Sequence, residues 1–188
     1  MRLKMRWALA PLCVMALAAC GEGGAGKADG TGAAAPSNRT LTATLKDDRA
    51  FGTLERVLEN AALGDVLAGT GPYTVFAPSD AAFAASAGDL GDEAMKAQGA
   101  AVLRAHIVPG ALTRADILAA IAREGSGEVE MRTMANSLLT FSKEGDVVIV
   151  AGDNGARARL TGSETLASNG VVQPVDGLLV RPTTAAAN

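Results

Sequence analysis

The chain has 188 residues, with 17 Lys and Arg against 20 Asp and Glu, and a formal net charge of −3. This acidic chain has no run of basic residues, which argues against nucleic acid as a partner because phosphate binding requires clustered Lys and Arg. Its two cysteines and one histidine are too few for a zinc site, and neither a metal nor another cofactor is expected.

The first 19 residues are predicted to be a signal peptide. Three basic residues within the first six precede an apolar stretch at 7–16 that is too short to span a bilayer. The segment Leu17-Ala18-Ala19-Cys20 then resembles a bacterial lipobox, which implies cleavage before Cys20 and lipidation of its thiol. The alternative is an ordinary secretory signal that is cut after Ala19 and leaves Cys20 free.

Residues 20–40 are predicted to be the lipidated Cys20 and a flexible tether, because small residues and isolated charges there show no apolar period. Residues 183–188 are predicted to be a disordered tail, which leaves a domain at 41–182. Removal of the signal changes the charge balance from 17 − 20 to 14 − 20, a net charge of −6. Membrane attachment would therefore depend on acyl chains, and Gly21 favours the outer membrane because the Asp that signals inner-membrane retention is absent.

The first predicted helix covers residues 48–62. Its apolar residues recur at three- and four-residue spacing, as expected for an amphipathic helix: Phe51, Leu54, Val57, Leu58 and Ala61. Gly64 and the cluster at 69–72 are interpreted as breaks that follow this helix.

The run Thr74-Val75-Phe76-Ala77-Pro78-Ser79-Asp80-Ala81-Ala82-Phe83 combines a strand, a turn and the start of a helix. Its first three residues favour a half-buried strand that is expected to stop at Pro78, which has no N–H for a ladder. Ser79 is predicted to cap a helix that begins at Asp80, whose charge suits the positive end of the helix dipole.

A further helix is predicted at 92–105, followed by His106-Ile107-Val108-Pro109-Gly110. His106 is the only histidine, and the favoured interpretation is a structural side chain that bonds a backbone carbonyl. The alternative is that His106, Ile107 and Val108 contact a partner. No catalytic residue is predicted, because the sequence offers His106 no recognisable nucleophile or triad spacing.

The second half of the chain changes to short strands, after a helix that Thr113 and Asp116 are predicted to cap. Strands are expected at 128–133, 138–142, 147–151 and 156–160, with a hairpin loop at 143–146 and a turn at 153–155. Arg157 and Arg159 alternate on one of these strands and are expected to face solvent. Helices followed by strands predict an α+β fold.

The last predicted strand, Val171–Val180, closes the sheet. Pro174 lies within it and cannot donate to a ladder, so an edge position or a bulge is expected there. Asn169-Gly170 precedes this strand and is typical of a tight turn with positive φ. That interpretation requires no ligand.

Three ordered segments of the chain resemble the motifs of the fasciclin (FAS1) domain family: Thr74–Phe83, Leu103–Gly110 and Glu164–Leu179. The resemblance covers nearly all of 41–182 and implies a compact α+β wedge of two β-sheets with helices packed alongside. The residues that it implies as structural are Thr74, Phe76, Pro78, Ser79, Asp80, Phe83, Pro109, Gly110, Asn169, Gly170, Asp176 and Gly177.

The same resemblance implies a function. Fasciclin modules are typically secreted or anchored at a surface, so a non-enzymatic, lipid-anchored module is expected to mediate adhesion or contact with an envelope or extracellular protein or glycan. Animal relatives use a Tyr-His pair for integrin binding, whereas this chain has Ala105-His106, and Glu164-Thr165 replaces the usual Asp-Ile. The alternatives are a periplasmic carrier with an apolar crevice between helices and sheet, and a hydrolase.

Overall fold

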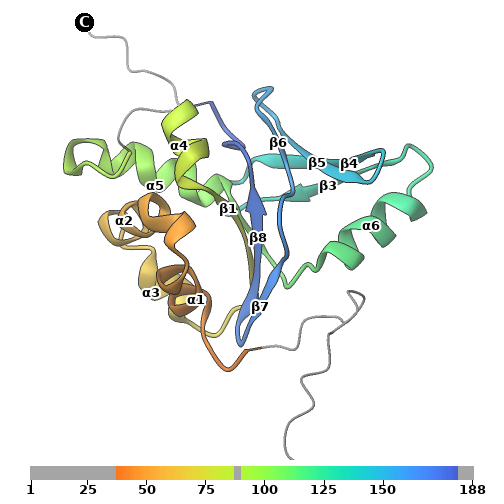
Figure 1. Cartoon of the computed structure of the whole chain (residues 1–188). Helices are drawn as coiled ribbons and strands as arrows, with labels where there is room; N and C mark the ends of the chain where they lie inside the picture. Colours follow the sequence, from red (N-terminus) through yellow and green to blue (C-terminus); the bar gives the residue numbers. More distant parts are fainter. Residues whose placement is uncertain (1–36, 87–89, 182–188) are drawn as a thin grey trace, which may run out of the picture. The chain divides into compact units, whose positions relative to one another are not determined.

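The structure is a computed structural model that describes residues 37–86 and 90–181 (Figure 1). The predicted signal peptide, Cys20, most of the tether and the tail at 183–188 lie outside the described residues. Within those residues, no helix combines the length and the apolar composition that are needed to cross a bilayer.

Helices dominate the first half of the domain. They are α1 (Leu41–Asp47), α2 (Gly52–Asn60), α3 (Gly64–Ala68), α4 (Asp80–Ser86), α5 (Lys96–Ala105) and α6 (Arg114–Arg123), with 3-10 turns at Arg49–Phe51 and Glu93–Met95. The helices predicted at 48–62 and 92–105 are confirmed, each with a 3-10 turn at its start. Two short helices, α1 and α3, were not predicted, and Gly64 begins α3 instead of ending the preceding helix.

The strands form two four-stranded sheets. They are β1 (Tyr73–Pro78), β2 (Ile107–Pro109), β3 (Glu128–Arg132), β4 (Leu138–Glu144), β5 (Val147–Gly152), β6 (Arg157–Arg159), β7 (Thr165–Ala167) and β8 (Gly170–Val175). The first sheet has the order β2-β1-β8-β7 and the second β3-β4-β5-β6. Only the central pair of the first sheet, β1 and β8, is parallel among these pairings. The predicted α+β class with two sheets is confirmed.

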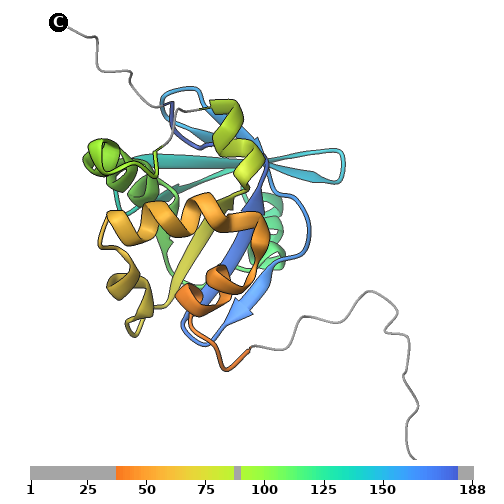
Figure 2. The same cartoon turned by 60° about the vertical axis from the view of Figure 1, so that its left-hand side comes forward.

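The first sheet is covered on both faces. Side chains of successive residues in a strand point to opposite faces, so Val75 and Ala77 join the core formed with α1–α5. Phe76 points the other way, into a core shared with the second sheet and α6, where its ring centroid lies 5.3 Å from that of Phe141. In Figure 2 the orange and yellow helices cross in front of this sheet, and the second sheet lies behind it.

This double coverage corrects one prediction about β1. Residues 74–77 are at most 1% exposed, so the strand is fully buried and not half-buried. The strand ends at Pro78, as predicted, where Pro78 pairs with Val175. Proline is tolerated there because it is the last residue of the strand, and Ser79 supplies the next N–H, which donates to the Val175 carbonyl at 3.4 Å.

The end of β8 also differs from the prediction. The strand stops at Val175, and β8 lies inside its sheet, so Pro174 is not on an edge strand. Proline is tolerated here because the pairing with β7 ends at Val172, and beyond it the Pro174 carbonyl accepts from the Thr161 N–H at 2.9 Å. The predicted helix cap at Thr113 is confirmed as a capping box with Asp116.

Candidate functional site

The fasciclin-like motifs meet around the first sheet, where their polar side chains hold backbone groups. Thr74 is fully buried, and its hydroxyl donates to the Gly110 carbonyl at 2.7 Å and accepts from the Leu112 N–H at 2.8 Å. The Gly110 N–H donates in turn to the Pro72 carbonyl. Thr74 therefore fixes the loop that follows β2 against the start of β1.

Ser79 and Asp80 organise two helix starts. The Ser79 hydroxyl accepts from the Ala82 N–H at 3.3 Å, as predicted for the cap of α4. Asp80 lies in the first turn of α4, but its carboxylate also accepts from the Thr53 N–H at 2.7 Å. Because the first four N–H groups of a helix lack internal partners, Asp80 also satisfies the N-terminus of α2.

Asn169 joins three separate segments through its side chain. Its carbonyl oxygen accepts from the Leu41 N–H at 2.8 Å, and its amide nitrogen donates to the Leu67 and Gly69 carbonyls, both at 2.7 Å. Its backbone carbonyl accepts from the Tyr73 N–H at 3.1 Å. This single residue therefore ties the start of α1 and the end of α3 to the hairpin between β7 and β8.

Asp176 and Gly177 connect the two sheets. The Asp176 carboxylate accepts from the Arg159 N–H at 2.6 Å, and the Asp176 N–H donates to the Arg159 carbonyl at 3.2 Å. A Cβ on Gly177 would lie 3.3 Å from the Arg157 carbonyl oxygen, so glycine lets this segment approach β6 closely without displacing it. The chain leaving β8 is thereby held along β6.

The residues predicted to contact a partner are placed differently. His106, Ile107 and Val108 are 0%, 1% and 4% exposed, so their side chains offer a partner no surface in this structure. His106 Nδ1 donates to the Val102 carbonyl at 2.7 Å, and Nε2 accepts from the Leu179 N–H at 2.9 Å. The expected bond to a backbone carbonyl is present, and burial lowers the pKa of His106 to about 4.

Glu164 links α6 to the first sheet. Its carboxylate accepts from the Arg114 N–H and from the side-chain amide of the buried Gln173, both at 2.6 Å. The Arg114 guanidinium extends this network to the Gly162 carbonyl at 2.9 Å and the Thr161 carbonyl at 3.1 Å. The replacement of the usual Asp by Glu164 therefore retains a carboxylate that binds backbone and side chain.

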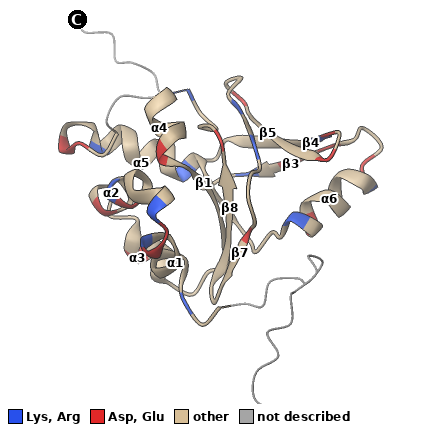
Figure 3. Cartoon of the chain, in the orientation of Figure 1, with Lys and Arg blue, Asp and Glu red and all other residues tan. Residues whose placement is uncertain are grey.

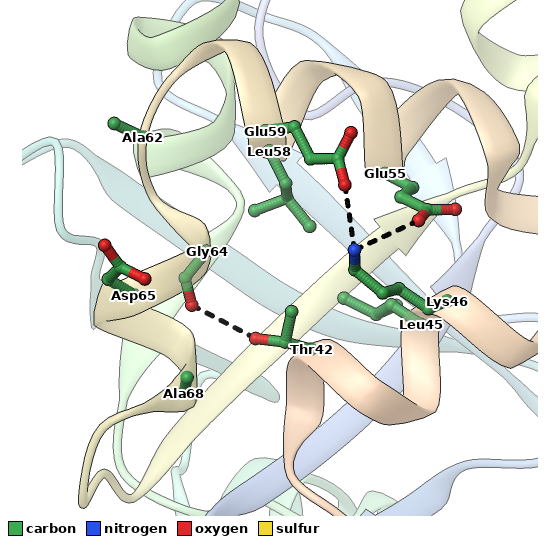
Figure 4. A pocket seen from close by; sticks show the side chains of 10 residues that line it. All are labelled: Thr42, Leu45, Lys46, Glu55, Leu58, Glu59, Ala62, Gly64, Asp65 and Ala68. Carbon is green, nitrogen blue, oxygen red and sulfur yellow. Dashed lines mark hydrogen bonds and ion pairs between the residues drawn. The ribbon is translucent and has the colours of Figure 1, made fainter.

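A hollow on the surface of the described residues lies among α1, α2 and α3, and we call it the helical groove (Figure 4). It has a volume of about 410 Å³, within the range of small-molecule sites. Leu45 and Leu58 form its apolar floor, and Thr42 closes one side by donating to the Gly64 carbonyl at 3.2 Å.

The rim of the helical groove is predominantly acidic. Lys46 reaches from α1 to α2, where its Nζ lies 2.8 Å from Glu59 and 3.5 Å from Glu55. The hydrogen bond that Lys46 donates to Glu59 raises the pKa of the lysine above its usual value, with the charges of both glutamates adding to the effect. Asp65 supplies a third carboxylate, so the rim suits a neutral or cationic ligand.

The helical groove replaces the crevice that was predicted between helices and sheet. That interface is filled by the core side chains of the α1–α5 cluster. The groove was not identified because α1 and α3 were not predicted. Thr40 accepting from the Ala43 N–H, followed by Leu41 and Leu45 four residues apart, is the signal that could have located α1.

The described residues contain no group of three or more His, Cys, Asp or Glu side chains that could hold a metal ion.

Comparisons with known proteins agree with one another on a fasciclin domain. The family model described as Fasciclin domain matches residues 49–181. Protein sll1483 of Synechocystis sp. is 31% identical over 155 residues, covering 80% of this chain and 78% of the relative.

Two animal proteins give similar matches. Stabilin-1 of Homo sapiens is 30% identical over 158 residues, which cover 77% of this chain and only 5% of Stabilin-1. The structure of a FAS1 domain pair from the insect cell adhesion molecule Fasciclin I aligns with a TM-score of 0.64. That alignment has 16% identity and covers 76% of this chain and 51% of the insect one, so the likeness concerns the fold alone.

Proposed function

Because the chain belongs to the fasciclin domain family, we propose that it is a non-enzymatic module that mediates adhesion or contact at the bacterial cell envelope. The match of the family model over residues 49–181 carries this proposal. The insect FAS1 pair that shares the fold comes from a cell adhesion molecule. The partner is an envelope or extracellular protein or glycan. The buried, neutral state of His106 supports a non-enzymatic role, because it withholds the chain's single histidine from any substrate.

The proposed module is held at the membrane by lipid on Cys20. The segment Leu17-Ala18-Ala19-Cys20 supports this anchor, and Gly21 favours the outer membrane. The described chain begins beside β7, where the Ser37 N–H donates to the Leu166 carbonyl at 3.0 Å and the Ser168 N–H donates to the Arg39 carbonyl at 2.7 Å. The tether would therefore join the domain at the β7 end of the first sheet.

Replacing Cys20 with Ser is expected to release the protein from the membrane fraction, because serine provides no thiol for the acyl chains that hold the module there. The measurement is fractionation of cells that express the full chain, followed by immunoblotting. Cys13→Ser is the matched control, since it changes the other cysteine but leaves the lipobox intact. Retention of the Cys20→Ser protein in membranes would contradict the anchor.

A second candidate function is that of a periplasmic small-molecule or lipid carrier. The observation that favours it is the helical groove, whose apolar floor and volume of about 410 Å³ suit a small ligand. Native mass spectrometry of protein purified from its own host is expected to show a co-purifying mass that Ala68→Trp removes, because Ala68 is an exposed residue that lines the groove. A spectrum with the protein mass alone would argue against this candidate.

A further inference from the structure

We propose that a surface groove along β6 binds an acidic polysaccharide through Arg157, Arg159 and Arg181. We call it the arginine groove. This inference deepens the proposed function by naming the chemistry of the partner, and it rests on the proposed function in assuming that the domain meets extracellular or envelope glycans.

The arginine groove consists of two adjoining hollows of about 540 and 580 Å³. The first contains Arg157 and Arg159, and the second contains Arg157 and Arg181, so Arg157 lies where the hollows meet. Gly177 also lines both. Three arginines that line two adjoining hollows fit a chain that carries several negative charges better than they fit one small anion.

The local structure presents these arginines outward. Arg157 and Arg159 are two residues apart on β6, so they share one face and lie roughly 6.6 Å apart along the strand. Between them Ala158 points into the core. Asp176 and the backbone of Arg159 bind each other, which holds the segment that leads to Arg181 beside the strand.

The guanidinium groups are available for a ligand. Within the described part of the chain, the Arg159 guanidinium has no hydrogen-bond or ion-pair partner. Arg181 makes a single long hydrogen bond of 3.4 Å, to the Gly155 carbonyl. Arg157 pairs with Glu144 at 2.7 Å, but both side chains are 60% exposed, and such surface pairs contribute little and can exchange partners.

The groove concentrates positive charge on an acidic domain. Its lining has three arginines against the carboxylates of Glu144 and Asp176, and the latter already accepts from a backbone N–H. Figure 3 shows the blue segments of β6 and of the last described residues near the top of the domain. Guanidinium groups pair with carboxylates in a bidentate manner, which favours a polysaccharide that bears carboxylates.

The place of the groove also favours an extracellular glycan over the anchoring membrane. The hairpin of β7 pairs with the first half of β8, whereas Asp176 follows the other end of β8 and binds β6. The arginine groove and the point where the tether would join therefore lie at opposite ends of β8 (Figure 1). A module held by Cys20 can turn this end away from its own membrane.

The test is calorimetric titration of the full chain carrying Cys20→Ser with polygalacturonate, at low and at physiological salt. Saturable binding that weakens as salt rises is expected, because screening reduces charge attraction. Arg159→Ala is expected to weaken binding by at least about tenfold, since it removes a charge-assisted contact. Arg123→Ala is the matched control, an exposed arginine on α6 outside the groove, and should leave binding unchanged.

Several outcomes would overturn the inference. They are no binding of polygalacturonate, equal loss of binding in Arg123→Ala, binding of neutral dextran with the same affinity, and tighter binding to phosphatidylglycerol vesicles than to the polysaccharide. Circular dichroism of Arg159→Ala verifies that the fold is intact. Absence of binding together with membrane retention of the lipidated chain would remove this inference and leave the proposed anchor standing.

Discussion

Replacing Asn169 with Ala is expected to lower the free energy of unfolding by about 3–5 kcal/mol. The substitution removes three side-chain hydrogen bonds and leaves the Leu41 N–H and the Leu67 carbonyl buried without those partners. An unsatisfied buried polar group costs about 1–3 kcal/mol, which is more than the net gain from one hydrogen bond. The measurement is equilibrium unfolding in urea.

Two variants separate this explanation from a general sensitivity to mutation. Asn169→Asp keeps the shape but turns a carboxylate oxygen toward the Leu67 and Gly69 carbonyls, so it should destabilise the domain as much as Asn169→Ala. Asn154→Ala removes one long bond of 3.3 Å in an exposed turn and should cost less than about 1 kcal/mol. An Asn169→Asp protein as stable as the parent chain would refute the role assigned to the amide.

The stability of the domain is expected to decrease by about 2 kcal/mol between pH 7 and pH 5 because of His106. Burial lowers the pKa of His106 in the folded state from 6.5 to about 4. Well above pH 6.5 the imidazole is neutral in both states and stability is complete. As the pH falls below 6.5, the unfolded chain binds a proton that the folded chain does not bind, so unfolding becomes more favourable.

His106 is the only histidine, which makes this dependence measurable. The free energy of unfolding of the parent chain and of His106→Gln would be compared from pH 7 to pH 5, and the variant should vary less. If His106→Gln does not fold, the ring resonances of His106 in the parent chain give a second measurement. Titration of this ring near pH 6.5 in the folded protein would contradict the prediction.

The sequence predicted the elements whose signals are local. Thr113 and Asp116 correctly predicted the start of α6, and Ser79 that of α4. Such predictions succeed because a helix cap depends on residues within one turn of each other. The short helices α1 and α3 lacked a comparable length of periodic sequence. Asn169 was interpreted as a turn former, and the three backbone partners of its side chain could not be read from its neighbours in the chain.

The candidate site was harder to predict than the fold. Arg157 and Arg159 were predicted to face solvent, and both are exposed. The arginine groove is completed by the chain that follows β8, whose contact with β6 could not be read from the sequence near these arginines. His106-Ile107-Val108 lies within a family motif, which suggested contact with a partner. Its burial follows from the position of β2 between α5 and the second sheet, a tertiary feature.

The parallel pairing of β1 with β8 also governs when the domain can fold. Tyr73 pairs with Gly170, about 100 residues later in the chain, so the middle of the first sheet stays open until the last strand arrives. Closing so long a loop costs entropy before any contact compensates for it. Helices α1 to α5 precede β8 in the chain, so they have no finished first sheet to pack against when they are synthesised. The first sheet therefore cannot be completed until β8 is available to pair with β1.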